Sequence, residues 1–317
     1  MRPSERAGTG WAGRERPVEL GHRVGARVTE PRFHVWGCRG GRNTQRSRIG
    51  NLTSCYSLRV GADLFVFDAG RGLLPLADAT LRDDALRGVA RVHVLVTHAH
   101  MDHWEGLKDA AWLWTPRNGL ELGLVGPAEA IEAIRRAHEP PLFVPLDVLA
   151  IGTLARLSFT ELAAGATFEL PGATLHAVAL HHYSGMSPHR RYLDTLGYHL
   201  VVHGGPRVAY LSDHEPTEAT RALENGLLAD SQLAIIDANY GAIADHAFGH
   251  GSIEYAAGLA RRHPTTWVMA GHHGPLRTDE AIEAEHGRHG ADCPNLTLAV
   301  EGTGARWDAA TGQFTRG

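Results

Sequence analysis

The chain has 317 residues, of which 43% are hydrophobic, and it carries a formal net charge of -4. These values favour a globular enzyme, and the weakly acidic charge argues against long nucleic acid as the preferred partner. No apolar run approaches the roughly 18 residues that cross a bilayer, and no secretory signal is recognisable, so we expect a cytoplasmic protein with no membrane partner. Three widely spaced cysteines indicate free thiols rather than disulfides.

Residues 1–30 are rich in arginine, glycine and proline and lack periodic apolar spacing. This composition predicts a poorly ordered tail, which leaves residues 31–317 for the folded domain. In chain order, the first half predicts a strand at 33–37, a β-hairpin at 54–60 and 63–67, a helix at 73–90, strands at 92–96 and 120–125, and a helix at 128–138.

The segment 142–151 is apolar but irregular, and we expect it to form a flap or wall beside a site. The second half predicts strands at 155–161 and 173–180, a hairpin at 196–203 and 207–211, a helix at 218–224, a strand at 232–236, a helix at 252–262 capped by Ser252, and a strand at 266–270. Interleaved strands and helices without an internal repeat indicate a single domain.

Three histidines and one aspartate follow the buried strand at 92–96, in the order Thr97-His98-Ala99-His100-Met101-Asp102-His103. His98 and His100 can turn to one metal ion, while Asp102 and His103 can turn to a second a few Å away. The alternative is an ordinary polar turn that happens to be rich in histidine. We prefer the metal cluster, because four ligand-type side chains in one tight loop would otherwise be hard to satisfy.

Other predicted strands also end in aspartate or histidine. These positions are Asp68, the pair His181-His182, Asp213, and the pair His272-His273. Side chains alternate between the faces of a strand, so only one histidine of each pair is expected to bind metal. The residues alone favour Asp213 and one histidine from each pair as the downstream ligands.

Taken in order, these motifs resemble the five motifs of the metallo-β-lactamase fold, over roughly residues 33 to 300. The details are similar to the branch of RNase Z-like phosphodiesterases. Three blocks carry this similarity: Trp36-Gly37-Cys38-Arg39-Gly40, Leu211-Ser212-Asp213-His214-Glu215-Pro216 and Phe248-Gly249-His250-Gly251-Ser252. Gly251 departs from the family pattern, which usually has serine there. The resemblance implies an α+β fold, an αββα sandwich with a binuclear metal centre at one edge of its paired sheets.

Carried over to this sequence, the resemblance implies two metal sites and a bridging carboxylate. The first site would comprise His98, His100 and His182, the second Asp102, His103 and His272, and the bridge Asp213. Asp68 would hydrogen-bond a ligand histidine and orient it. His182 and His272 are thus preferred to their neighbours. Imidazole-rich sites suit two Zn2+ ions, although a mixed His/Asp set also accepts manganese or iron.

His250 precedes a predicted helix, and the resemblance implies that it contacts the phosphate and assists the leaving group. Alternatively, His250 only caps the helix that follows it. A hydroxide held between the metals would attack phosphorus, and Asp102 could orient it. His214 and His246 are further candidates for positions near the substrate.

The predicted function is hydrolysis of a small or cyclic nucleotide-like phosphodiester. An RNase Z-type tRNA endonuclease is less favoured, because the chain lacks a long Gly- and Arg-rich insertion that would grip tRNA and is acidic overall. Thioester or lactone hydrolysis at the same metal centre is a second alternative, and a non-catalytic metal-dependent sensor is a third. A homodimer is compatible with the sequence.

Overall fold

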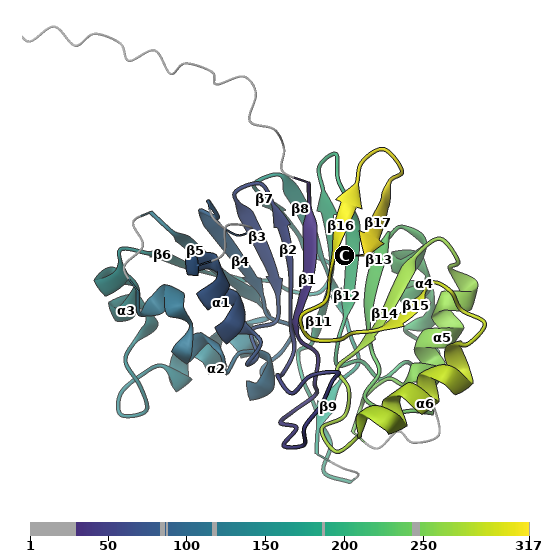
Figure 1. Ribbon diagram of the computed structural model, residues 1–317. Coiled ribbons are helices and arrows are strands. Elements are labelled where there is room, and N and C mark those ends of the chain that lie inside the picture. Colours follow the sequence, from purple (N-terminus) through teal and green to yellow (C-terminus); the bar gives the residue numbers. More distant parts are fainter. Residues whose placement is uncertain are drawn as a thin grey trace, which may run out of the picture.

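Two large β-sheets lie face to face, with helices on their outer sides, in the computed structural model of the protein (Figure 1). The structure describes residues 30–82, 86, 88–115, 119–185, 188–242 and 248–316. The predicted N-terminal tail, apart from Glu30, and His246 lie outside these residues. Within them, the predicted αββα sandwich is confirmed.

The first sheet has the spatial strand order β17-β16-β1-β2-β3-β4-β5-β6. In chain order its strands are β1 (Arg32–Gly37), β2 (Cys55–Val60), β3 (Asp63–Phe67), β4 (Arg91–Leu95), β5 (Glu121–Gly126), β6 (Arg156–Glu161), β16 (Gly304–Asp308) and β17 (Gln313–Arg316). Strands β3 to β6 are mutually parallel, so their carboxyl ends lie at one edge of the sheet.

The second sheet has the order β15-β14-β13-β12-β11-β8-β7. Its strands are β7 (Thr167–Leu170), β8 (Ala173–Ala179), β11 (Leu196–Val202), β12 (Arg207–Leu211), β13 (Leu233–Asp237), β14 (Trp267–Gly271) and β15 (Leu296–Leu298). Strands β12 to β15 are parallel. A short ribbon of β9 (Tyr183–Ser184) and β10 (Arg191–Tyr192) lies at the lower end of the molecule in Figure 1.

Helices α1 (Leu73–Arg82), α2 (Ala128–Ala137) and α3 (Leu146–Thr153) flank the first sheet, and α4 (Arg221–Ala229), α5 (Ile253–Arg262) and α6 (Asp279–Gly290) flank the second (Figure 1). Helices α1, α2 and α5 each bury an apolar face. In α2, for example, Ala130, Ile131 and Ile134 are buried and the opposite face is charged. Among the described residues, no helix combines the length and apolar character needed to cross a membrane.

The main core fills the space between the sheets. Alternate residues of β1, such as Phe33 and Val35, point into it and meet buried residues of the second sheet, including Leu175 and Leu200. A second core lies between the first sheet and its helices. Because both faces of β3 are covered, all five of its residues are buried.

Hydrogen bonds tie the two sheets together at the edge where the parallel strands end. Tyr198 of β11 donates its hydroxyl to the Val96 carbonyl at 2.5 Å, and the Leu196 amide donates to the Thr97 carbonyl at 2.9 Å. These bonds bring the carboxyl ends of β4 and β12 to the same end of the sandwich. Residues that follow strands of either sheet therefore meet there.

Two predicted helices are shifted. The helix expected over 73–90 corresponds to α1, which ends at Arg82; Gly88, with a φ of 87°, and Val89, whose amide closes a turn on Leu86, are not helical. The helix expected over 218–224 is α4, which begins at Arg221. Thr217 and Thr220 exchange side-chain and backbone hydrogen bonds, and this turn occupies the positions before it.

The apolar segment 142–151, which the sequence predicts to be irregular, is partly helical. It contains the start of α3, which follows Pro145 and buries Leu146 and Ala150, four residues apart, on one side. The predicted cap of α5 is confirmed, since Ser252 accepts a hydrogen bond from the Tyr255 amide at 3.1 Å.

Candidate metal centre

Seven histidine and aspartate side chains converge at the carboxyl ends of the parallel strands. One group comprises His98, His100, His182 and Asp213, and another comprises Asp102, His103 and His272; within each group the ligand-type atoms lie within 4.8 Å of one another. The structure thus brings together all seven residues for which the sequence predicted a metal-binding role. They come from loops after β4, β8, β12 and β14.

Asp213 stands between the two groups and presents one carboxylate oxygen to each. Its Oδ2 lies 3.6 Å from His98 Nε2 and 3.5 Å from His182 Nε2. Its Oδ1 lies 3.2 Å from His103 Nε2 and 3.0 Å from His272 Nδ1. A carboxylate shared by two cations requires this arrangement.

The imidazoles of His98 and His103 each leave a buried Nε2 atom without a hydrogen-bond partner among the described residues. An unsatisfied buried nitrogen costs about 1–3 kcal/mol, and a metal ion would satisfy both. Burial lowers the pKa of His98 well below its usual range and that of His182 to about 4. Both rings are therefore neutral near pH 7, which is the form that binds metal.

His103 differs, because carboxylates surround it. Burial alone would lower its pKa, but Asp213 and Asp68 outweigh burial and raise it well above the usual value. The negative charge that attracts a proton to this ring would equally attract a metal cation. The donor set as a whole fits divalent metal ions.

Asp68 orients His103. Its Oδ2 accepts hydrogen bonds from His103 Nδ1 and from the Tyr210 hydroxyl, both at 2.7 Å, and its Oδ1 accepts one from the Thr97 amide at 2.8 Å. The bond at Nδ1 leaves Nε2 of His103 turned towards Asp213. The position of Asp68 thus matches the orienting role expected from the sequence.

Three residues of the centre have left-handed backbone conformations. Asp68 and His272 follow β3 and β14 directly, Asp213 follows β12 after one residue, and their φ values are 56°, 52° and 55° respectively. This conformation turns each side chain out of the strand and into the cluster. It costs about 1–2 kcal/mol for a residue other than glycine, and such strain concentrates at functional sites.

His250 lies beside the cluster and is held by Asp237, a residue for which the sequence predicted no role. His250 Nδ1 is 2.8 Å from Asp237 Oδ2, and the His250 ring stacks on that of His272 at a centroid distance of 5.1 Å. Burial would lower the pKa of His250, but the Asp237 carboxylate outweighs it and raises the pKa to about 9. One signal for Asp237 was available, because it too ends a predicted strand.

The neighbours of the clustered histidines point elsewhere. His181 Nδ1 pairs with Glu215 at 3.1 Å, and His273 Nε2 lies 3.1 Å from the Ala299 carbonyl in the core. His214 is buried, with its Nε2 2.6 Å from Glu224 Oε1, and does not join the cluster. Alternation along the chain therefore brings one histidine of each pair into the site, as expected.

A cavity of about 270 Å³ opens onto the cluster. Besides the ligand-type residues, Tyr183, Ser184 and Phe248 line it, and sequence reasoning had assigned them no role. Ser184 Oγ lies 2.5 Å from His100 Nε2. Gly40 also lines it, and a Cβ there would lie 2.4 Å from His272 Nε2, so no larger residue fits beside that ring.

Comparisons with known proteins identify the fold. A family model described as "Beta-lactamase superfamily domain" matches residues 64–284. Similar solved structures include Zn2+-bound PqqB from Methylobacterium extorquens (16% identity, TM-score 0.62, covering 86% of this chain and 99% of that one), unliganded yeast PDE1 (13%, 0.60, 89% and 100%) and the short form of human tRNase Z (17%, 0.58, 86% and 98%). No curated protein matches the sequence.

Proposed function

Because this chain belongs to the β-lactamase superfamily, we propose that it is a binuclear metal-dependent hydrolase of small or cyclic nucleotide-like phosphodiesters. Membership of this superfamily supports a metal-dependent hydrolase. The choice of a phosphodiester substrate over a thioester or lactone rests on one observation. His250, held at 2.8 Å by the buried carboxylate of Asp237, faces the same cavity as five of the seven ligand-type residues.

In this proposal each metal has three ligands of its own. His98, His100 and His182 would hold one cation, Asp102, His103 and His272 the other, and Asp213 both. When bound, two such cations lower the pKa of water and polarise phosphoryl oxygens. We propose zinc because imidazole predominates, while the mixed set also suits manganese or iron.

The chain's own residues would move the protons. Asp102 lines the cavity and is positioned to accept a hydrogen bond from the attacking water. In His250, the bond between Nδ1 and Asp237 leaves Nε2 free to face the substrate. A protonated His250 would donate from Nε2 to the departing alkoxide oxygen and offset charge on the phosphoryl group.

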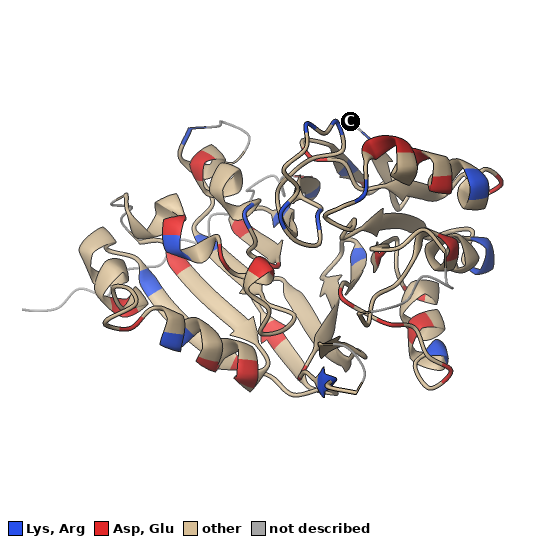
Figure 2. Ribbon diagram, turned by 90° about the horizontal axis from the view of Figure 1, so that it is seen from below, with Lys and Arg blue, Asp and Glu red and all other residues tan. Residues whose placement is uncertain are grey.

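The cavity and its surroundings favour a small substrate. A volume of about 270 Å³ suits a single nucleotide-sized group near the metals. Figure 2, which views the molecule from below, shows acidic and basic residues interspersed over the flanking helices. An extended nucleic acid would be better matched by a continuous basic surface, so tRNA is the less favoured substrate.

The first test is hydrolysis of bis(p-nitrophenyl) phosphate and of cyclic nucleotides by the zinc-loaded chain, compared with His100→Ala. Loss of a ligand should reduce kcat by at least about 100-fold, because the reaction depends on the metal. If the wild type is no faster than His100→Ala on every phosphodiester, the proposal fails.

The second test addresses His250. An alkoxide is a poor leaving group and needs a proton, whereas p-nitrophenolate does not. We therefore expect His250→Ala and Asp237→Asn to slow cyclic nucleotide hydrolysis by about 100-fold or more and to affect the p-nitrophenyl ester much less. Full activity of His250→Ala, together with cleavage of thioesters or lactones, would favour carbonyl chemistry instead.

A further inference from the structure

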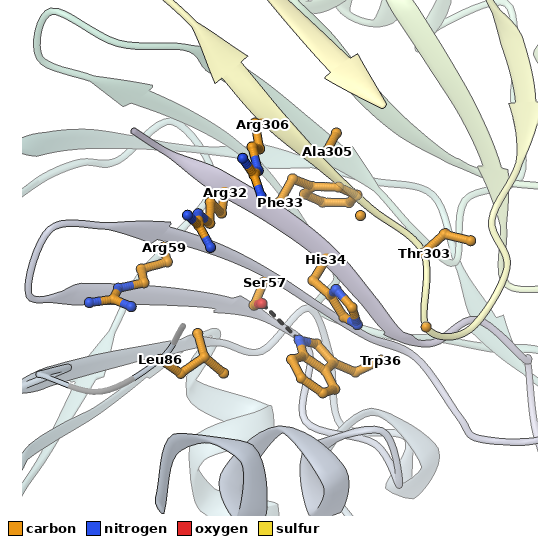
Figure 3. Close-up of a pocket in the computed structure, with 12 residues that line it drawn as sticks. Arg32, Phe33, His34, Trp36, Ser57, Arg59, Leu86, Thr303, Ala305 and Arg306 are labelled. Carbon is orange, nitrogen blue, oxygen red and sulfur yellow. Dashed lines mark hydrogen bonds between the residues drawn. The ribbon is translucent and has the colours of Figure 1, made fainter. Parts of the chain in front are cut away.

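Three arginines face one another across neighbouring strands of the first sheet. Arg32 of β1 pairs in register with Arg59 of β2 on one side and with Arg306 of β16 on the other. Residues directly opposite share a face, and Phe33, next along β1, points into the core, so the three arginines lie on the outer face. Figure 3 shows their side chains gathered at one end of a cavity.

This row brings together like charges, which destabilises neighbouring strands. Among the described residues, Arg32 and Arg306 form no ion pair, and the residues that line the cavity include no aspartate or glutamate. Arg59 donates its Nε to the Gly61 carbonyl at 3.1 Å. Burial lowers the pKa of Arg59, and the charge of Arg32 lowers it further. In the part of the chain that the structure describes, the charges of Arg32 and Arg306 thus meet without an ion pair to an acidic side chain.

Aromatic rings line the rest of the cavity. His34 and Trp36 follow Arg32 on the same face of β1, and their ring centroids are 4.1 Å apart. The indole is fixed, because its Nε1 donates to Ser57 Oγ at 2.8 Å, as Figure 3 shows. The cavity has a volume of about 360 Å³, enough for a small organic molecule.

The arginine row is separate from the metal centre. Strand β1 runs in the same direction as β3, because each is antiparallel to β2. Arg32 opens β1, whereas the cluster follows the carboxyl ends of β3 and β4. Six residues of strand span about 20 Å, so the row lies near the opposite end of the sheet.

We propose that this cavity is a second ligand site that binds a nucleoside di- or triphosphate. The arginine guanidinium groups match phosphate oxygens in geometry and charge, and phosphate would relieve their mutual repulsion. The base would lie against the rings of His34 and Trp36, where a planar group can stack. The ligand class follows from this combination of several cations with an aromatic wall.

The test measures binding of a non-hydrolysable ATP analogue to the zinc-loaded full chain by isothermal titration calorimetry. Hydrogen bonds to charged groups contribute enough that Arg32→Gln and Arg306→Gln should each weaken binding about tenfold. Arg136→Gln, which removes an exposed arginine of α2, should change it less than about twofold. Adenosine and tripolyphosphate should each bind more weakly than the analogue, because adenosine lacks the phosphates and tripolyphosphate lacks the base.

A second readout requires no ligand. Removing one charge from the row should raise the melting temperature of the free protein in low salt, so Arg32→Gln should melt higher than wild type and Arg136→Gln should not. The proposal is overturned if Arg32→Gln and Arg306→Gln bind the ATP analogue as tightly as the control Arg136→Gln. It is also overturned if binding falls in His250→Ala but not in Arg32→Gln, because the nucleotide would then occupy the metal cavity.

Discussion

Asp68 shows how much of the centre depends on one side chain that would not itself touch a metal. Its carboxylate accepts hydrogen bonds from His103, Tyr210 and Thr97 and is fully buried. An acceptor at this position fixes which nitrogen of His103 faces Asp213. Exchange of the carboxylate for an amide would keep the shape but weaken that control.

We therefore expect Asp68→Asn to bind zinc about 10- to 100-fold more weakly than wild type. A chelator competition titration measures the affinity directly. Tyr210→Phe is the matched control, because it removes one hydrogen bond to Asp68 but leaves the bond to His103 in place. Equal affinity of Asp68→Asn and wild type would show that Asp68 does not tune the site.

At the scale of single residues, residue type and spacing predicted much of the candidate metal centre. Four ligand-type residues in one loop, and single aspartates or histidines at strand ends, marked positions that do converge in space. Asp237 was not predicted, because its contact with His250 joins the end of β13 to a loop and only the fold creates it. Tyr183 and Phe248 were not predicted either, because an aromatic residue type does not indicate which cavity the side chain will line.

At the scale of elements, a buried ion pair fastens the loop after β1 to the first residue of α6. Arg39 is fully buried, and its Nη2 donates to Asp279 Oδ1 at 3.0 Å, while its Nη1 donates to the Arg277 carbonyl. Asp279 also accepts from Ser47 Oγ at 2.6 Å. The glycine-rich loop that contains Gly40 is thus locked beside His272.

The Arg39–Asp279 pair should make stability depend on acid pH. Burial would raise the pKa of Asp279, but bonds from Ser47 and the Arg48 amide outweigh it and lower the pKa below its usual value. A depressed folded-state pKa means that the contribution is complete above about pH 4 and is lost as pH falls through the lower folded value.

We accordingly expect Asp279→Asn to reduce the unfolding free energy by about 3 kcal/mol at pH 7, and the difference from wild type to shrink towards pH 2. Urea denaturation at several pH values measures both effects. Glu283→Gln breaks the exposed ion pair with Arg48 and should cost less than about 1 kcal/mol. A pH-independent loss in Asp279→Asn would contradict the argument.

Several elements could not be predicted from periodicity alone. Helix α3 is short, and its apolar residues extend around most of its circumference, so it has little amphipathic contrast. Helix α6 has the opposite character, with few buried residues, and depends on the Thr278 side chain, which accepts a bond from the Ala281 amide. Long, largely buried strands such as β11 were predicted within a residue of their observed ends.

At the scale of the whole molecule, both sheets contribute to the centre, with four residues from the first and three from the second. Asp102 and three histidines follow β4 of the first sheet, whereas His182, Asp213 and His272 follow strands of the second. Metal ions in this position would join the two halves of the sandwich. Their binding energy would then add to the stability of the entire fold.

Removal of metal should therefore lower the melting temperature. At free metal 1,000 times the dissociation constant, binding contributes about 4 kcal/mol, which corresponds to about 7 °C for a domain of this size. Thermal scans with and without a chelator test this. Asp213→Asn should melt at nearly the same temperature in both conditions, and a chelator effect as large as that of wild type would exclude Asp213 as a shared ligand.

The left-handed strand ends at Asp68, Asp213 and His272 have a consequence for the evolution of such a protein. Glycine at any of these positions would relax the backbone and gain about 1–2 kcal/mol, while removing a side chain of the centre. The backbone term alone thus favours glycine at three separate positions, whereas the hydrogen bonds that Asp68 and His272 make to buried groups oppose it. Persistence of all three residues requires continued selection for what the side chains do, against the preference of the backbone.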